Sequence, residues 1–356
     1  MSITEVHVAS AETLPTTSQK AVVPDVEIKE VADIAPAVTE AIAEEAPKKV
    51  RTTTGVTGMF NGTKDGKDAY IDYATGSTNI NPPLEVPITV EDVRDYEVKP
   101  TFHGNGYQLV DHKTQMHPDQ FSNGRTPEGQ EFIQNAYYPE VQKLVQQVTG
   151  AAIVKPYIFR TRHQFEKPTD FIASRKSNAS ALPLAHTDRD MTTGANGVRD
   201  VFGVEEGNRL MRTHRRFAQV NVWRGIGKTV DRWPLMFIDT SDIPGGFKYE
   251  KNLAKIYSAN DPRVVQRGVK AHDVVLVDNP HYKYRYASRL QVDEAWVFSS
   301  FDSDENKVCP HGGFWDDSTD DAAPARTSIE CRTWCFWDPI EEEAAPTPAP
   351  AAPIAV

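Results

Sequence analysis

The clearest hydrophobic period in the chain runs from residue 126 to residue 149 and predicts an amphipathic helix. Thr126 is a suitable N-cap, Pro127 stands at the first helical position, and Gly150 follows the last periodic residue. Apolar positions recur at three- and four-residue steps, namely Phe132, Ala136, Tyr137, Val141, Leu144, Val145 and Val148. We expect this helix to pack on the outside of a β core.

Most other apolar residues fall in short β-rich runs separated by Asp, Gly, Pro and Asn. The predicted strands are residues 104–110, 152–160, 217–223, 235–238, 274–277, 282–286, 296–301 and 329–336. Many short strands of this kind are typical of a sandwich or barrel. The Gly-, Thr- and Pro-rich stretch 52–97 is interpreted as extended arms and turns. Residues 194–214 are polar and predicted to be partly helical, as an insertion over the mouth of a site. The fold class is mainly β with flanking helices.

The two ends differ in composition from the rest. Residues 1–51 are acidic and contain no aromatic side chain, and residues 341–356 consist of acidic residues followed by Ala and Pro repeats. Such segments bury too little apolar surface to offset their chain entropy, so both are predicted to be disordered. A single domain is expected over residues 52–340.

The net charge of −11 comes mostly from these ends. The remaining core has no basic stripe, which argues against nucleic acid as a partner. No stretch approaches the length of a membrane span, so no membrane partner is expected. Three cysteines are too few for a disulfide framework. We therefore expect a cytoplasmic protein that acts on a small molecule; the sequence carries no indication of its oligomeric state.

Two short motifs suggest a metal site. His186-Thr187-Asp188 places an imidazole and a carboxylate two residues apart, and His311 adds a second imidazole. On a strand, or on the loop that leaves it, side chains two apart project to the same face. Two His and one carboxylate form the ligand set of non-heme Fe(II) oxygenases. His272 and His281 are alternatives to His311, but neither is followed by an Arg-x-Ser sequence.

Arg326-Thr327-Ser328 follows His311 and predicts a clamp for a dicarboxylate co-substrate. A planar guanidinium suits a carboxylate, and the serine hydroxyl adds a hydrogen bond. Glu330 and Arg332 alternate on the same predicted face, so either they pair with one another or Arg332 is the clamp instead. The order of the H-x-D motif, the distal His and the Arg fits a double-stranded β-helix, or jelly-roll, core.

Several blocks in the second half of the chain resemble a known family. The blocks are Asn221-Val222-Trp223-Arg224, Asp293-Glu294, Phe301-Asp302-Ser303, His311-Gly312-Gly313-Phe314 and Arg326-Thr327-Ser328-Ile329-Glu330-Cys331-Arg332. Together they resemble the fungal hydroxylase/desaturase family of Fe(II)/2-oxoglutarate-dependent oxygenases, over roughly residues 85–338. Gly225-Ile226 departs from the Pro-Leu that the family usually has after the Arg.

The resemblance implies Fe(II) as cofactor, with 2-oxoglutarate and O₂ as co-substrates. It also implies hydroxylation, desaturation or oxidative ring closure of an intermediate of fungal secondary metabolism. Asn221 and Arg224 are candidates for contact with substrate or with groups around the metal. Trp334 and Phe336 alternate on a strand and are candidates for the substrate pocket, with an aromatic core pair as the alternative. Two other functions stay open: a jelly-roll protein that binds a metal or ligand without catalysis, and a zinc-dependent hydrolase.

Overall fold

The structure is a computed structural model that describes residues 49–72, 74–122, 124, 126–164, 184–259, 271–320 and 322–340. The described residues belong to one compact unit that begins at Lys48. The predicted disordered ends lie outside the described residues, except for residues 49–51. Within the described residues, no helix is long and apolar enough to span a membrane.

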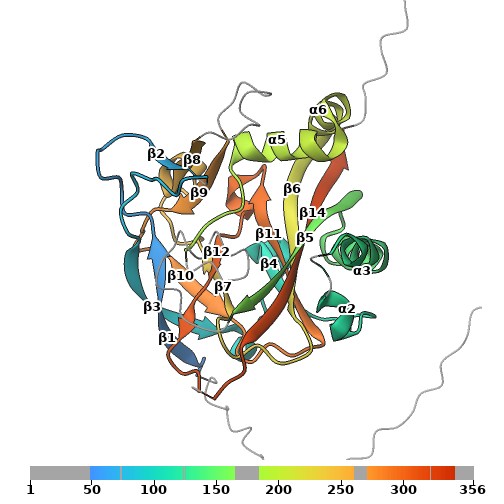
Figure 1. Ribbon diagram of the computed structural model, residues 1–356, viewed down its shortest axis with the longest axis horizontal. Coiled ribbons are helices and arrows are strands. Elements are labelled where there is room, and N and C mark those ends of the chain that lie inside the picture. Colours follow the sequence, from blue (N-terminus) through green and yellow to red (C-terminus); the bar gives the residue numbers. More distant parts are fainter. Residues whose placement is uncertain are drawn as a thin grey trace, which may run out of the picture. The chain divides into compact units, whose positions relative to one another are not determined.

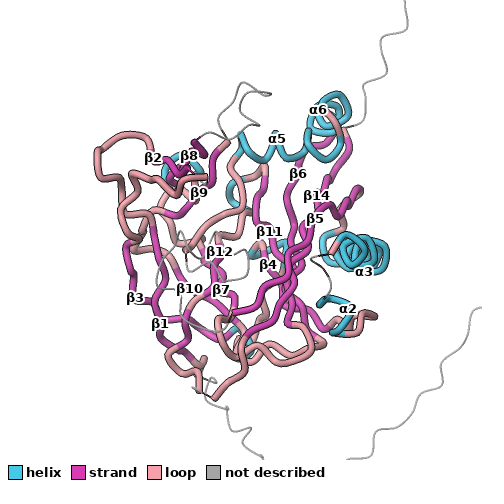
Figure 2. Tube along the Cα trace, in the orientation of Figure 1, coloured by secondary structure: helices cyan, strands magenta, loops and turns pink. Residues whose placement is uncertain are grey.

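Strands dominate the fold and form two large sheets (Figures 1 and 2). The first has six strands in the order β12-β7-β10-β3-β1-β13, and the second has five in the order β4-β11-β6-β14-β5. A smaller sheet has the order β2-β8-β9. The strands are β1 (Thr52–Met59), β2 (Ala69–Asp72), β3 (Leu84–Asp92), β4 (Tyr107–Asp111), β5 (Ile153–Gln164), β6 (His214–Gly225), β7 (Leu235–Asp239), β8 (Leu253–Ala259), β9 (His272–Leu276), β10 (Lys283–Tyr286), β11 (Glu294–Asp302), β12 (His311–Gly313), β13 (Trp315–Asp316) and β14 (Arg326–Pro339).

Each strand predicted after residue 100 is present, although the ends differ by a few residues. The interpretation of residues 52–97 as arms and turns is wrong. In this stretch β1 and β3 pair antiparallel from Thr52↔Glu91 to Met59↔Leu84 and lie inside the six-stranded sheet. The side chains of β1 alternate between exposed and buried along its first half, as expected for a strand with one face on the core.

The helices are α1 (Phe102–Asn105), α2 (Pro118–Ser122), α3 (Pro127–Thr149), α5 (Met191–Phe202), α6 (Val204–Thr213) and α7 (Tyr249–Asn252). Helix α3 begins and ends as predicted: the Thr126 side chain accepts a hydrogen bond from Gly129 N, and Gly150 has a φ of 64°. The predicted buried face is wrong at its start. Phe132 is 44% exposed, and Ile133 is buried in its place, so the buried stripe is one position out of phase there.

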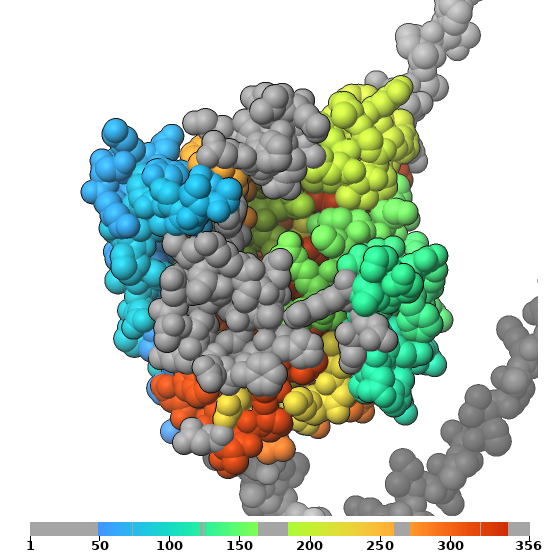
Figure 3. Space-filling model, in the orientation of Figure 1, coloured from blue at the N-terminus to red at the C-terminus, as the bar shows by residue number. Residues whose placement is uncertain are grey.

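Helix α3 packs against the outer face of the five-stranded sheet, while α5 and α6 lie at the upper end of that sheet in Figure 1. The polar stretch 194–214, which the sequence predicted to be helical in part, is helical over most of its length. In the space-filling view α6 and α3 lie on the same side of the surface (Figure 3). Cys331 and Cys335 are buried under α3 as unbridged core residues.

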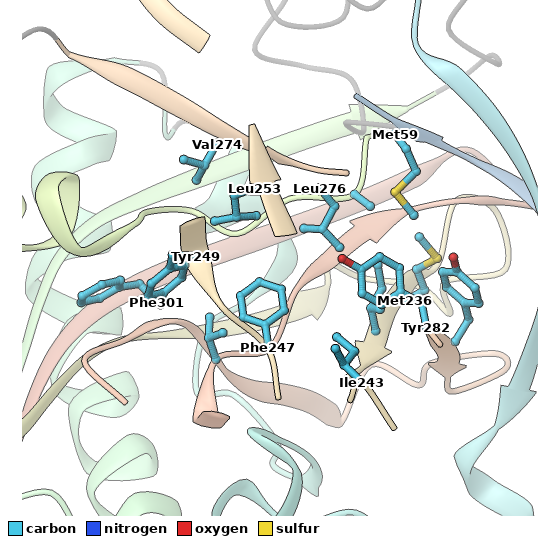
Figure 4. Close-up of a cluster of buried hydrophobic side chains, with 14 of the residues drawn as sticks. Met59, Met236, Ile243, Phe247, Tyr249, Leu253, Val274, Leu276, Tyr282 and Phe301 are labelled. Atoms are coloured by element: carbon cyan, nitrogen blue, oxygen red, sulfur yellow. The ribbon is translucent and has the colours of Figure 1, made fainter. Parts of the chain in front are cut away.

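A large apolar cluster joins residues of the six-stranded sheet, the five-stranded sheet and α5. Figure 4 shows part of it, including Tyr249 stacked beside Phe301 at a centroid distance of 6.0 Å. Helix α5 approaches this cluster closely, because a Cβ on Gly194 would lie 2.4 Å from the Phe301 ring. The cluster fixes the strands that carry the polar residues described below.

Candidate metal and co-substrate site

The segment that carries His186 is held between β12 and β9. His186 N donates to His311 O at 3.0 Å, and His311 N donates to His186 O at 2.9 Å. On the other side, Leu276 N donates to Ala185 O at 2.9 Å, and further on Asp188 N donates to Ser300 O of β11 at 3.0 Å. These backbone bonds connect both large sheets at one place. They bring the H-x-D segment against the strand of the distal histidine.

The three predicted metal ligands lie together. One donor atom from each of His186, Asp188 and His311 falls within 4.8 Å of the other two. His311 is buried at 2% exposure, whereas His186 and Asp188 are partly exposed. Two imidazoles and one carboxylate at this separation can hold one transition-metal ion and leave other positions open.

Hydrogen bonds to backbone carbonyls orient both imidazoles. The Nδ1 of His186 lies 2.7 Å from Leu184 O, and the Nδ1 of His311 lies 3.1 Å from Cys309 O. A carbonyl only accepts, so Nδ1 carries the proton and donates in each case, and Nε2 keeps a lone pair for a metal. Burial, with a contribution from His311, lowers the pKa of His186 to about 4. The imidazole is therefore neutral at pH 7, as a metal ligand must be.

Asp188 is surrounded by donors. Gln219 Nε2 and Asn221 Nδ2 donate to its Oδ2 at 2.7 and 2.8 Å, and Arg332 Nη2 lies 2.9 Å from its Oδ1. Burial acts to raise the pKa of Asp188, but Arg332 and the two imidazoles outweigh it and hold the pKa below its ordinary value. Asp188 is thus a carboxylate over the working pH range.

Arg332 bridges Asp188 and Glu330. Its Nε donates to Glu330 Oε1 at 2.7 Å, so the pairing considered from the sequence is present. Burial acts to lower the pKa of Arg332, but the two carboxylates raise it above its ordinary value. Two nitrogens of this guanidinium therefore already contact carboxylates, Nε that of Glu330 and Nη2 that of Asp188.

Arg326 has a different environment, on the same face of β14. It is 3% exposed and its Nη1 donates to Trp233 O at 2.5 Å, while its guanidinium lies 5.5 Å from the Trp223 ring. Within the described residues its Nε has no hydrogen-bond partner, and neither does the buried Ser328 Oγ. Burial and repulsion by Arg162 lower the pKa of Arg326 to about 9. A buried guanidinium next to an unpaired hydroxyl fits an anionic ligand, because an uncompensated buried charge is costly.

The other candidate residues lie elsewhere. His272 Nε2 is 2.8 Å from Asp190 Oδ2, and His281 is exposed, so neither joins the three-residue cluster. Arg224 is on the opposite face of β6, where its Nη1 lies 3.6 Å from Glu140 of α3. Of the two β6 candidates, only Asn221 reaches the cluster.

Trp334 and Phe336 are fully buried in the large apolar cluster. Phe336 packs against Phe217 and Phe202. The Trp334 ring stacks on Tyr157 at 6.0 Å and lies 5.6 Å from the Arg189 guanidinium. Its indole Nε1 has no hydrogen-bond partner among the described residues.

The chain matches known proteins over most of its length. Residues 60–336 match the family described as Oxidoreductase/YMDC permease-like domain. The chain is 40% identical over 292 residues to oxidoreductase clz16 of Cochliobolus lunatus, which covers 81% of this chain and 98% of that protein. It is 27% identical over 304 residues to hydroxylase/desaturase efuI of Hormonema carpetanum, covering 82% and 97%.

The chain belongs to this oxidoreductase family, and its relatives include fungal oxidoreductases and a fungal hydroxylase/desaturase. The resemblance inferred from the sequence is thereby confirmed, and the protein is an oxidoreductase. Among solved structures, the iron and alpha-ketoglutarate-dependent endoperoxidase NvfI has a similar fold, with a TM-score of 0.64 at 20% identity over 80% of this chain and 98% of that one.

Sequence reasoning missed Gln219 and Ser300, which lie next to Asp188. Gln219 Nε2 donates to Ser300 Oγ at 2.9 Å as well as to Asp188, and both residues are completely buried. The signal was present in the run Phe217–Trp223, where Gln219 and Asn221 alternate with small apolar residues. Buried polar side chains at alternate positions of a strand require partners on one face.

Proposed function

We propose that His186, Asp188 and His311 bind Fe(II) and that Arg326 and Ser328 hold the distal carboxylate of 2-oxoglutarate. The grouping of the three donor atoms within 4.8 Å carries this proposal. The unpaired Arg326 Nε and Ser328 Oγ support the second part. Bound Fe(II) and 2-oxoglutarate supply O₂ activation and removal of a hydrogen atom from the substrate.

The residues of the chain prepare this chemistry in separate ways. The two imidazoles and the Asp188 carboxylate form one ligand face, held by β9, β11 and β12. Arg326 lies on the same face of β14 as Arg332, which contacts Asp188. This alternation supports our proposal that the clamp and the ligands share one inner surface of a double-stranded β-helix core.

The substrate proposed is a small-molecule intermediate of fungal secondary metabolism. The reaction is hydroxylation, desaturation or oxidative ring closure. Trp334 remains the aromatic candidate for substrate contact, because its Nε1 is unpaired and Tyr157 and Arg189 lie beside it. Phe336 packs among Phe217 and Phe202, and this position favours a core role over substrate contact.

The test is O₂-dependent formation of succinate from 2-oxoglutarate by the purified protein with Fe(II). A strain that lacks this gene should accumulate the substrate, and its extract should stimulate succinate formation. His186→Ala should abolish turnover and metal binding. Substrate conversion without O₂ would favour the zinc hydrolase, and no turnover by folded, iron-loaded protein with that extract would favour the non-catalytic binder.

A further inference from the structure

The carboxylate of Asp188 is held by two strands of the five-stranded sheet. Gln219 and Asn221 alternate on β6, and their amide nitrogens both donate to Oδ2, at 2.7 and 2.8 Å. Arg332 of β14 approaches Oδ1 at 2.9 Å. Each contact comes from a side chain whose backbone is fixed within a long antiparallel ladder, with Arg332 opposite Asn221. Asp188 itself lies just past the bridge that its segment makes with β12.

Other hydrogen bonds fix which way each amide points. Gln219 Oε1 accepts from Tyr157 OH at 2.6 Å and from Arg189 Nε at 2.8 Å. Asn221 Oδ1 accepts from Ser300 Oγ at 3.1 Å. Reversing Gln219 would place its NH₂ group against the Tyr157 and Arg189 donors, and reversing either amide would place a carbonyl oxygen against the Asp188 carboxylate. Both NH₂ groups therefore point toward the Asp188 carboxylate.

The two oxygens of Asp188 differ in the acceptor capacity that remains. An ionised carboxylate offers about four lone-pair sites, two on each oxygen. The two amides fill both sites of Oδ2 with hydrogen bonds, whereas among the described residues Oδ1 has only an ion-pair contact with Arg332 Nη2 at 2.9 Å. A metal held by His186 and His311 can then use Oδ1 without breaking a hydrogen bond. Binding through Oδ2 would displace an amide and leave a buried donor unpaired, which is costly.

We infer that Gln219 and Asn221 are positioning residues that present Asp188 to the metal through Oδ1 alone. The inference rests on the proposed function, because it presupposes the metal. The inference has a consequence for metal coordination. A carboxylate that bound the metal through both oxygens would occupy a coordination position that the co-substrates need. By binding Oδ2, the two amides prevent this oxygen from binding the metal, so that the coordination position stays open.

The first experiment is an anaerobic Co(II) titration of purified metal-free protein. Gln219→Met and Asn221→Leu each remove a donor at nearly constant size, and each should raise the Kd of the metal by roughly 10- to 100-fold. Thr333→Val is the matched control, because it removes a buried hydroxyl that joins the same two strands on their other face, at 2.9 Å from Val220 O. It should lower the unfolding midpoint and leave the Kd unchanged.

Ser300→Ala provides a second test of the inference if the Gln219 and Asn221 variants do not fold. It deletes the hydroxyl that contacts both amides, so it should raise the Kd by roughly three- to ten-fold, as expected for one neutral hydrogen bond. Wild-type affinity in all variants that fold would overturn the inference and leave the proposed function intact. A wild-type protein that binds no Co(II) would instead contradict the proposed function.

The second experiment is a crystal structure of the metal-loaded wild type. The inference predicts a metal on the oxygen that faces Arg332, with the other oxygen still bonded to Gln219 and Asn221. A metal on the oxygen that faces the amides, or on both oxygens, would overturn it.

Discussion

Arg332 and Asp188 form an ion pair of 2.9 Å at the centre of the site, so the guanidinium that the sequence left as an alternative clamp is already bound to a predicted metal ligand. Arg326, six residues earlier on the same strand face, contacts no carboxylate among the described residues. The two arginines therefore have separable roles.

Replacing Arg326 with Gln should impair use of 2-oxoglutarate. The change removes a charge-assisted contact of about 1.5–3 kcal/mol, so the apparent Kd for 2-oxoglutarate should rise by roughly ten- to a hundred-fold. Metal affinity should stay nearly constant. Isothermal titration of the metal-loaded protein measures the first quantity and Co(II) titration the second. An unchanged 2-oxoglutarate affinity in folded Arg326→Gln would remove Arg326 from the clamp.

Ser328→Ala should act in the same direction with a smaller size. It deletes one neutral hydrogen bond of about 1 kcal/mol, which corresponds to roughly a five-fold weaker binding of 2-oxoglutarate. The Ser328 Oγ is buried without a partner in the described residues, so the variant should also keep its unfolding midpoint. A large loss of stability would show that the hydroxyl has a structural role instead.

Arg332→Gln should weaken metal binding first. It removes the cation that orients Asp188 and pairs with Glu330, and such supporting changes typically cost roughly 10- to 100-fold in metal affinity. At saturating metal, 2-oxoglutarate affinity should approach the wild-type value. If the variant bound metal normally but lost 2-oxoglutarate, Arg332 would be the clamp.

Glu294, the first residue of β11, makes the free energy of unfolding depend on pH. It accepts from Arg94 Nη1 at 2.7 Å and from Gln291 N at 2.8 Å. Burial acts to raise the pKa of Glu294, but the Arg94 hydrogen bonds outweigh it and lower the pKa below 4.5. The unfolded chain therefore binds the proton more readily, so this stabilisation is present above pH 4.5 and is lost as the pH falls through the folded pKa.

Glu294→Gln should consequently destabilise the protein by about 1–3 kcal/mol at pH 7 and by progressively less below pH 4.5. Urea unfolding of both proteins between pH 7 and pH 3 measures the difference. A difference that stayed constant across this range would contradict the assignment.

Local signals in the sequence predicted the parts of the fold that local chemistry decides. The ends of α3 follow from Thr126 and Gly150, which satisfy backbone groups next to them in the chain. The phase of its buried face depends on the sheet below it, and there the prediction for Phe132 was wrong. Likewise β1 and β3 looked like arms, because their pairing is with distant residues that no local pattern reveals.

The residues of the site likewise differ in whether the sequence alone could predict them. His186 and Asp188 could be found because they are two residues apart and carry recognisable metal-binding groups. The structure adds the identity of the residues that hold them: Gln219 and Ser300 have no motif, and they meet Asp188 only after β6 and β11 are paired. The role of Arg332 likewise required knowing which side chain lies opposite it.

The central claim is that one metal ion and 2-oxoglutarate bind together at His186, Asp188, His311 and Arg326. Visible absorption of the purified protein under anaerobic conditions tests it most directly, without need of the substrate. Addition of Fe(II) and 2-oxoglutarate should produce a weak charge-transfer band that is absent with succinate and absent in Asp188→Ala. A folded, iron-loaded wild-type protein that shows no such band, or an Asp188→Ala protein that shows it in full, would contradict the account.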